Sequence, residues 1–209
     1  IVRSRSQEVD TLRLRALVKE LELKTIKSHI NPHFIFNALN SIRALIDENP
    51  ARARDAVTGL SKLLRSSMQS EHLETVSLEE ELGILRDYLA LEHIRFEDRL
   101  RVEMHIDEMT LDLRVPPMML QTLVENAIKH GVSQSVSGGD IDIRSSLSDD
   151  GFEIVVRNSG TLKEAISQQG FGISSTENRL KLQYGDQASF SIGNVEGGFV
   201  EARILLPLS

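Results

Sequence analysis

The sequence predicts an α+β protein of two domains, a helical hairpin followed by an α/β sandwich. Apolar residues recur at a spacing of three and four over the first 70 positions, which is typical of amphipathic helices. Beyond residue 100, short runs alternate between apolar and polar residues, as strands do. Helical segments are mixed with these runs without strict βαβ alternation, which favours an antiparallel-rich sheet with helices on one face. We place the two domains at residues 1–75 and 76–209.

The first domain is predicted to contain two helices. Residues 7–46 have the spacing of one long helix whose beginning resembles a coiled coil, and residues 47–50 form a turn. The second helix is predicted over 51–70, with one apolar face made of Ala53, Val57, Leu60, Leu64 and Met68. Such a hairpin cannot bury both of its apolar flanks alone, so we expect it to pair with a second copy as a four-helix bundle.

The second domain is predicted to begin with a helix. Ser77 and Glu80 have the spacing of a capping box, and the helix is expected to run to about Phe96. Another helix is predicted from Met118 to His130, where Gly131 ends it. The remaining predictions are a helix over 173–183 and strands over 101–106, 141–144, 152–157, 188–192 and 199–206.

Composition excludes several classes of function. The net charge of −7 argues against non-specific nucleic-acid binding, and the absence of Cys excludes disulfides, Cys-based metal sites and thiol chemistry. No apolar run approaches the roughly 20 residues that span a bilayer. The chain begins with Ile, so we expect it to be a fragment of a longer protein.

A polar stripe on the first helix is the first candidate site. His33, Asn37 and Asn40 share one helical face with apolar residues on either side. Asn31 and Pro32 are typical of a helix start, which would make His33 an ordinary first-turn residue. Alternatively, the helix continues through Pro32 at a cost of about 3 kcal/mol and presents a nucleophilic imidazole. A metal pair of His29 and His33 would lack further ligands.

The other candidate sites lie in the second domain. Glu125, Asn126, Lys129 and His130 are expected to face a cleft, where an amide oxygen can bind Mg²⁺ and Lys can meet phosphate oxygens. A solvated helix end with cations near its C-terminus is the alternative. Asn158-Ser159-Gly160 follows a predicted strand, and Gly170 and Gly172 precede a helix whose N-terminal amides favour anions. A β-turn and a glycine-rich hinge are the simpler interpretations of these two segments.

The order of these motifs resembles the kinase core of sensor histidine kinases of the LytS/YehU type. The resemblance extends from about Leu23 to the end of the chain, and its most specific parts are INPHFIFNALNSI and PPMMLQTLVENAIKHG. It implies a dimerisation hairpin followed by a GHKL (Bergerat) ATP-binding domain. It also implies that His33 takes the γ-phosphoryl group of ATP, while Asn37 holds the ring or the incoming phosphoryl group.

The resemblance assigns roles to the other motif residues. Asn126 is the implied Mg²⁺ ligand, and Lys129 and His130 stand where phosphate contacts are expected. Glu125 is a candidate for orienting a metal-bound water or the ring of His33. Asn158 replaces the usual adenine-reading Asp, and its Oδ1 remains an acceptor for the adenine amino group. The nucleotide-box glycines correspond to Gly160, Gly170 and Gly172.

The implied function is autophosphorylation by ATP and transfer of the phosphoryl group to an aspartate of a response regulator. The chain would be the cytoplasmic portion of a membrane-bound sensor, would form a homodimer, and would not bind nucleic acid. A dimeric signalling module of the same fold with impaired catalysis is one alternative, supported by Asn158 and by Ser175, which stands where the family commonly has Asn. Another ATPase of the same fold is the second, and the N-terminal histidine helix speaks against it.

Overall fold

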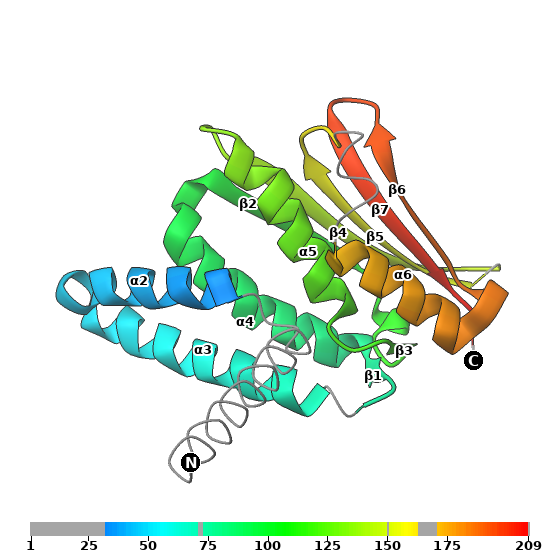
Figure 1. The fold of residues 1–209 in the computed structure, drawn as a ribbon, viewed down its shortest axis with the longest axis horizontal. Coiled ribbons are helices and arrows are strands. Elements are labelled where there is room, and N and C mark those ends of the chain that lie inside the picture. Colours follow the sequence, from blue (N-terminus) through cyan, green and yellow to red (C-terminus); the bar gives the residue numbers. More distant parts are fainter. Residues whose placement is uncertain (1–31, 71–72, 150, 163–170, 209) are drawn as a thin grey trace, which may run out of the picture.

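The N-terminal part of the structure is a hairpin of two helices (Figure 1). The computed structural model describes residues 32–70, 73–149, 151–162 and 171–208, so the predictions for residues 7–31, including His29, and for Gly170 lie outside the described residues. Helices α2 (Pro32–Glu48) and α3 (Pro50–Ser70) are joined at Asn49, whose Oδ1 accepts a hydrogen bond of 3.0 Å from the backbone N–H of Arg52. Both helices and the turn confirm the prediction for this stretch.

The hairpin buries one flank and exposes the other. Helix α2 buries Phe34, Ala38, Ile42 and Leu45, and α3 buries Ala53, Ala56, Leu60 and Leu63. The predicted apolar face of α3 is divided between core and surface, because Ala53 and Leu60 are buried whereas Val57 and Met68 are 50% and 70% exposed. The reason is that helix α4 packs against both α2 and α3, and covers the neighbouring flank of the hairpin.

Helix α4 (Leu78–Phe96) begins at the predicted capping box. The Ser77 hydroxyl accepts from the backbone N–H of Glu80, and the Glu80 carboxylate accepts from the backbone N–H of Ser77. Immediately before α4, strand β1 (Val76–Ser77) pairs with β3 (Arg114–Val115) to form a two-stranded antiparallel ribbon. This ribbon lies where the chain leaves the hairpin and enters the α/β layer.

Five strands form the main sheet in the order β2-β4-β5-β7-β6. They are β2 (Leu100–Ile106), β4 (Gly139–Ser148), β5 (Gly151–Ser159), β6 (Ser189–Val195) and β7 (Phe199–Leu206). Strands β2 and β4 run parallel, and the other neighbours are antiparallel. The predicted strands and the antiparallel-rich character of the sheet are thus confirmed.

Helices cover one face of the sheet (Figure 1). Helices α5 (Met119–His130) and α6 (Phe171–Tyr184) pack against the strands, and short 3-10 helices occur at Glu97–Arg99, Glu108–Thr110, Val132–Gln134 and Gly185–Gln187. One hydrophobic core extends from Phe34 through α4 to Leu206. Helix α4 packs against both the hairpin and the α/β layer, so its contacts do not mark a division between two domains. The domain boundary between residues 75 and 76 therefore stays a prediction.

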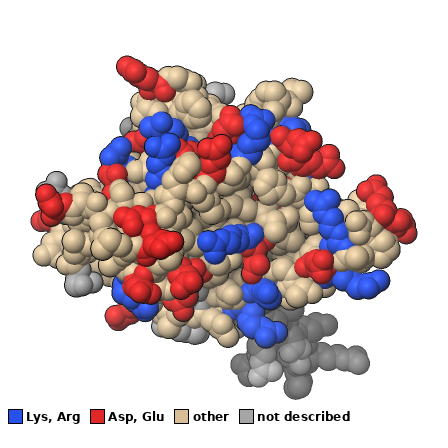
Figure 2. Space-filling view, turned by 180° about the vertical axis from the view of Figure 1, so that it is seen from behind, with Lys and Arg blue, Asp and Glu red and all other residues tan. Residues whose placement is uncertain are grey.

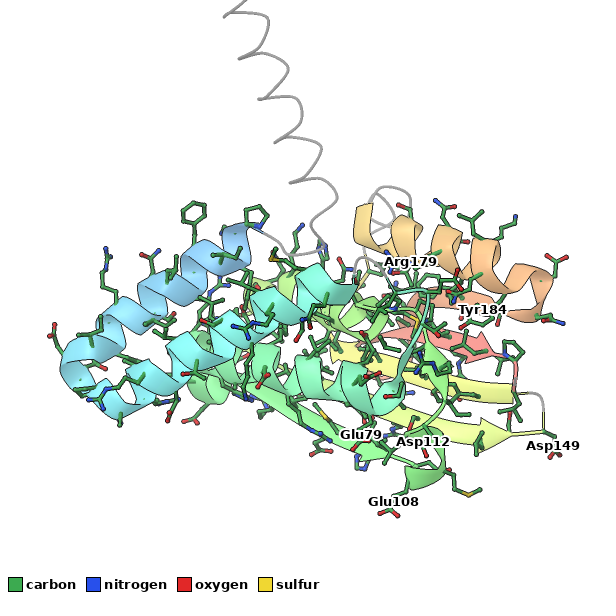
Figure 3. All side chains as sticks on the ribbon, turned by 90° about the horizontal axis from the view of Figure 1, so that it is seen from below. Glu79, Glu108, Asp112, Asp149, Arg179 and Tyr184 are labelled. Atoms are coloured by element: carbon green, nitrogen blue, oxygen red, sulfur yellow. The ribbon has the colours of Figure 1, made fainter. Side chains whose placement is uncertain are left out.

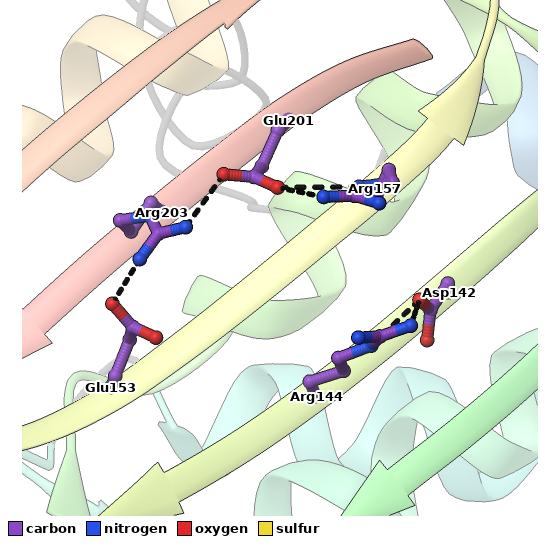
Figure 4. A network of polar contacts seen from close by, with 6 residues as sticks. All are labelled: Asp142, Arg144, Glu153, Arg157, Glu201 and Arg203. Carbon is purple, nitrogen blue, oxygen red and sulfur yellow. Dashed lines mark hydrogen bonds and ion pairs between the residues drawn. The ribbon is translucent and has the colours of Figure 1, made fainter. Parts of the chain in front are cut away.

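The other face of the sheet carries charged side chains. Seen from behind, the surface has Lys and Arg interspersed with Asp and Glu (Figure 2). Glu201 accepts from Arg157 at 2.6 Å and from Arg203 at 2.9 Å, and Arg203 also reaches Glu153 at 2.6 Å (Figure 4). Solvated pairs of this kind contribute little stability, and they keep this face hydrated. Within the described part of the chain, no helix combines the length and the apolar character that crossing a membrane requires.

Candidate functional site

A pocket lies between α5 and the β5, β6 and β7 strands. Its polar lining includes the side chains of Asn126, His130 and Asn158, and the chain at Thr161 closes one side. The apolar lining comes from both layers, namely Leu123, Ala127, Val156, Leu162, Ile192, Val200 and Ala202. An apolar pocket with a few convergent polar groups is the usual form of a small-ligand site, and the cavity volume here is about 30 Å³.

Helix α5 brings Asn126 and His130 to this pocket, one turn apart. The amide nitrogen of Asn126 donates to the backbone carbonyl of Thr122 at 2.8 Å, which leaves its Oδ1 as an acceptor for a ligand. Burial lowers the pKa of His130, and the neighbouring charge of Lys129 lowers it further. His130 is therefore a neutral imidazole at physiological pH and presents one donor and one acceptor.

Asn158 is fixed by a close approach of two backbones. Its side chain is 7% exposed, and its Nδ2 donates to the backbone carbonyl of Ser159 at 2.9 Å. A Cβ at position 131 would lie 2.5 Å from that Nδ2, so only glycine fits opposite it. Gly131 caps α5 with φ −102°, so this close approach, and not a positive φ, is what requires glycine. The Oδ1 of Asn158 is left as an acceptor.

The turn that follows Asn158 is anchored to β6 and to the β6–β7 turn. Gly160 has φ +127°, a conformation that favours glycine, and its N–H donates to the carbonyl of Gly198 at 2.9 Å. Asn194 of β6 accepts from the backbone N–H of Leu162 at 2.7 Å and donates to its carbonyl at 3.2 Å. These bonds hold residues 160–162 at the rim of the pocket.

The structure separates Glu125 and Lys129 from this pocket. Lys129 is exposed, and neither residue lines the pocket. Glu125 accepts a hydrogen bond of 2.8 Å from Gln121. Burial raises the pKa of Glu125 to about 7, and the charge of Glu92 on α4 raises it further. The hydrogen bond from Gln121 and the charge of Lys129 lower the pKa in part. Of the four α5 residues expected to face one cleft, Asn126 and His130 do so together.

The candidate phosphoacceptor lies on the first turn of α2. His33 is exposed, and Asn37 Nδ2 lies 3.2 Å from its Nδ1. The next residue, Phe34, is buried, and its ring centroid lies 4.8 Å from that of Tyr88 on α4. No described α2 residue lines the pocket, so His33 and the pocket are separate in this arrangement. Gly172 lies in the first turn of α6.

Sequence reasoning missed Asn194 and the apolar lining from the β6–β7 hairpin. The lining residues occupy alternate positions on their strands, which was the available signal, but nothing in that pattern distinguishes a pocket wall from ordinary core. Asn194 gave no signal, because its role depends on a loop that is 32 residues away in the chain.

The chain is similar in sequence to known proteins. A family model described as histidine kinase matches residues 21–100. The sensor protein LytS of Staphylococcus saprophyticus is 34% identical over 190 residues, which cover 85% of this chain and 32% of that protein. The sensor histidine kinase/phosphatase LytS of Staphylococcus aureus is 32% identical over 197 residues, with 87% and 34% covered. The chain thus spans about a third of the length of the curated relatives it matches.

Two solved structures share the fold. The histidine kinase domain of the Erythrobacter litoralis EL346 blue-light activated histidine kinase aligns with a TM-score of 0.50 at 19% identity, covering 89% of this chain and 93% of that one. Acinetobacter baumannii histidine kinase AdeS aligns with a TM-score of 0.51 at 14% identity, covering 95% and 98%. At these identities the likeness concerns the fold, and it confirms the predicted α+β architecture of a helical hairpin and an ATP-binding-type sandwich.

The fold is that of histidine kinase domains. In sequence the chain is similar to histidine kinases over residues 21–100 and to the LytS sensor proteins over most of its length.

Proposed function

We propose that this chain is an ATP-dependent protein-histidine kinase core that phosphorylates itself on His33 and passes the phosphoryl group to an aspartate of a response regulator. The observation that carries the proposal is a pocket with two oriented amide oxygens, Asn126 and Asn158, in the same chain as an exposed imidazole held by a neighbouring amide. A relative named as a sensor histidine kinase/phosphatase is similar over 87% of this chain.

Asn158 supports adenine as the base. Because its Nδ2 is committed to the backbone of Ser159, its Oδ1 is the atom offered to a ligand. An acceptor fits the 6-amino group of adenine and opposes the 6-oxo group of guanine. The apolar walls from Val156, Ile192 and Ala202 suit the faces of a purine ring. We therefore expect binding of ATP and ADP in preference to guanine nucleotides.

Asn126 is suited to a magnesium site. Magnesium in nucleotide sites keeps several waters and takes few protein oxygens, the rest coming from phosphates. Asn126 supplies one amide oxygen at the pocket, and no cluster of three acidic or histidine ligands exists among the described residues. This donor set fits Mg²⁺ held together with the phosphates of ATP, where it would neutralise developing charge. His130 would add a neutral contact to the phosphates, whereas Lys129 does not line the pocket.

Asn37 supports the role of His33. The amide nitrogen of Asn37 lies 3.2 Å from Nδ1 and 3.5 Å from Nε2 of His33, so the amide is within reach of the imidazole ring. Rotation of the amide by half a turn would offer Oδ1 to an Nδ1–H and expose the Nε2 lone pair to the γ-phosphorus. A P–N bond then forms as the bond from that phosphorus to the leaving oxygen of ADP breaks. In that rotated position Asn37 would hold the reactive tautomer of His33.

The exposed flank of the hairpin supports a homodimer. A groove at its closed end is lined by Ile42, Ile46, Pro50, Ala53 and Val57, and large apolar side chains stand exposed on both helices, namely Phe36, Leu39, Ile46, Val57 and Met68. An apolar surface of this kind on a soluble hairpin is explained by a second copy that completes a four-helix bundle. Val57→Asp should give a monomeric mass by sedimentation, whereas Lys62→Asp on the opposite side of α3 should leave the dimer intact.

Incubation with ATP labelled in the γ-phosphate tests the kinase proposal. The expected result is an acid-labile, alkali-stable label on the protein that His33→Gln abolishes and His105→Gln, on strand β2, leaves unchanged. Asn126→Ala should abolish labelling, and Asn37→Ala should slow it, since the tautomer is no longer selected. Added receiver domain should remove the label from the chain.

The outcome separates the proposal from its alternative. Binding of Mg-ADP without any label would identify a signalling module of the same fold with impaired catalysis. A label that persists in His33→Gln would show that the acceptor is another residue.

A further inference from the structure

The two-stranded ribbon is the point at which the hairpin chain and the nucleotide helix meet. We call β1, β3 and their flanking residues Glu74, Thr75, Pro116 and Pro117 the junction ribbon. The β1 end comes from the hairpin, and the β3 end continues into α5. Arg114 joins the two strands at their side, because its guanidinium donates to the Thr75 carbonyl at 2.6 Å and to the Thr75 hydroxyl at 3.1 Å.

Helix α6 is bonded to both ends of the junction ribbon. Arg179 donates to the Pro117 carbonyl at 2.7 Å, and Gln183, one turn further on, donates to the Glu74 carbonyl at 3.0 Å. Between them Leu180 is buried, and Arg179 and Tyr184 lie on the side of α6 that faces the rest of the domain (Figure 3). Both acceptors are main-chain carbonyl oxygens, so these two hydrogen bonds depend on the position of the ribbon backbone.

Helix α4 holds the start of α5, which follows the junction ribbon directly. The buried carboxylate of Glu81 accepts from the backbone N–H groups of Met118 at 2.5 Å and Leu120 at 3.0 Å. Met118 has φ +62°, a conformation that side-chain-bearing residues rarely adopt. The strained turn that starts α5 is thus fixed between a carboxylate of α4 and the guanidinium of Arg179. About two turns further along α5 lies Asn126, at the pocket.

We propose that α6 couples the nucleotide pocket to the phosphoacceptor hairpin, and that Arg179 and Gln183 are the positioning residues through which it does so. This inference rests on the proposed nucleotide-binding function. Helix α6 packs against α5 and β6, which both line the pocket, and its two side chains reach the ribbon that leads to the hairpin. A nucleotide that shifts α6 relative to α5 changes the Gln183–Glu74 bond, and by linkage the ribbon changes nucleotide affinity equally.

A dye on the hairpin side of the ribbon tests this coupling without catalysis. The chain has no cysteine, so Leu73→Cys, an exposed position beside Glu74, can be labelled with an environment-sensitive fluorophore in the full chain. Titration with Mg-ADP is expected to change the fluorescence, with binding measured separately by calorimetry. Gln183→Met keeps the size of the side chain and removes its donor. It should reduce the amplitude of the fluorescence change about fivefold, because the loss of one hydrogen bond changes an equilibrium constant by about that factor.

Three further variants give the test its controls. Gln183→Arg retains a donor and should restore the response, and Lys181→Met on the exposed side of α6 should leave it unchanged. Arg179→Lys, which keeps a cation near Glu81, should reduce the response with little change in melting temperature. Calorimetric affinity in Gln183→Met should change by no more than about the same factor of five, because the coupling is reciprocal and Gln183 does not line the pocket.

Two results would overturn the coupling. One is calorimetric binding of Mg-ADP with no fluorescence change in the parent, and the other is an equal change in the parent and in Gln183→Met. Absence of any Mg-ADP binding in the parent would refute the nucleotide-binding function itself, and the coupling with it.

Discussion

Replacing Glu125 by Gln should stabilise the protein at alkaline pH. The carboxyl group is largely buried between α5 and α4, and its pKa is raised from 4.5 to about 7 by that burial, with the charge of Glu92 adding to it. A folded-state pKa above the unfolded value means that stability is complete below about pH 4.5 and falls as the pH rises through 7. Glutamine carries no charge, so the stability of the variant should not fall in this way as the pH rises.

The size of the effect follows from the two pKa values. Each pH unit between 4.5 and about 7 costs about 1.4 kcal/mol, so ionised Glu125 lowers the free energy of unfolding by about 3 kcal/mol at pH 8. The Gln side chain keeps an oxygen for the bond from Gln121 and adds a donor near Glu92 Oε2 and Gln121 Oε1, two buried oxygens without a hydrogen-bond partner.

Urea unfolding followed by circular dichroism at pH 5 and pH 8 measures the difference. We expect Glu125→Gln to match the parent closely at pH 5 and to gain about 3 kcal/mol at pH 8, or about 6–12 °C in melting temperature. Glu103→Gln, an exposed glutamate on β2, is the matched control and should change the stability by less than about 0.5 kcal/mol at either pH. An equal effect of Glu125→Gln at both pH values, or a loss at pH 8, would refute the reasoning.

Three further substitutions test local features. Gly131→Ala places a Cβ 2.5 Å from Asn158 Nδ2, and we expect calorimetry to show at least about tenfold weaker Mg-ADP binding. The free energy of unfolding should fall by about 1–3 kcal/mol. Glu97→Gly relieves an exposed residue at φ +51° and ψ −132°, and should raise the free energy of unfolding by about 1 kcal/mol, so unchanged melting would count against strain there. Ser77→Ala removes the hydroxyl that caps α4 and should cost about 1 kcal/mol in urea, whereas Ser77→Asp should retain most of the stability.

Local sequence patterns predicted the elements well because their causes are local. The capping box at Ser77, the glycine after His130 and the alternation in the strands each depend on residues within a few positions. The buried flank of α3 could not be predicted in this way. Whether Val57 or Ala56 points inward depends on α4, which is distant in the chain and packs against the hairpin.

The motifs of the candidate site could be predicted from the sequence, but which of their residues face the pocket could not. Asn126 and His130 face the pocket, but Glu125 lies among the buried groups beside α4. Helical spacing places all of them on neighbouring parts of one surface, and only the position of α4 decides which part is covered. Glu81 illustrates the same limit, because its function at the start of α5 joins residues 37 and 39 positions apart.

The order of the sheet has a consequence for solubility. Strands β2 and β6 are its edges, and an edge strand offers unpaired backbone groups to other chains. Strand β2 carries the exposed charged or titratable side chains of Arg101, Glu103 and His105, while Asn194 of β6 is bonded to the chain at Leu162. Both edges therefore discourage strand addition and amyloid-like growth, so that the proposed dimer contact at the helical hairpin would not compete with pairing along the sheet.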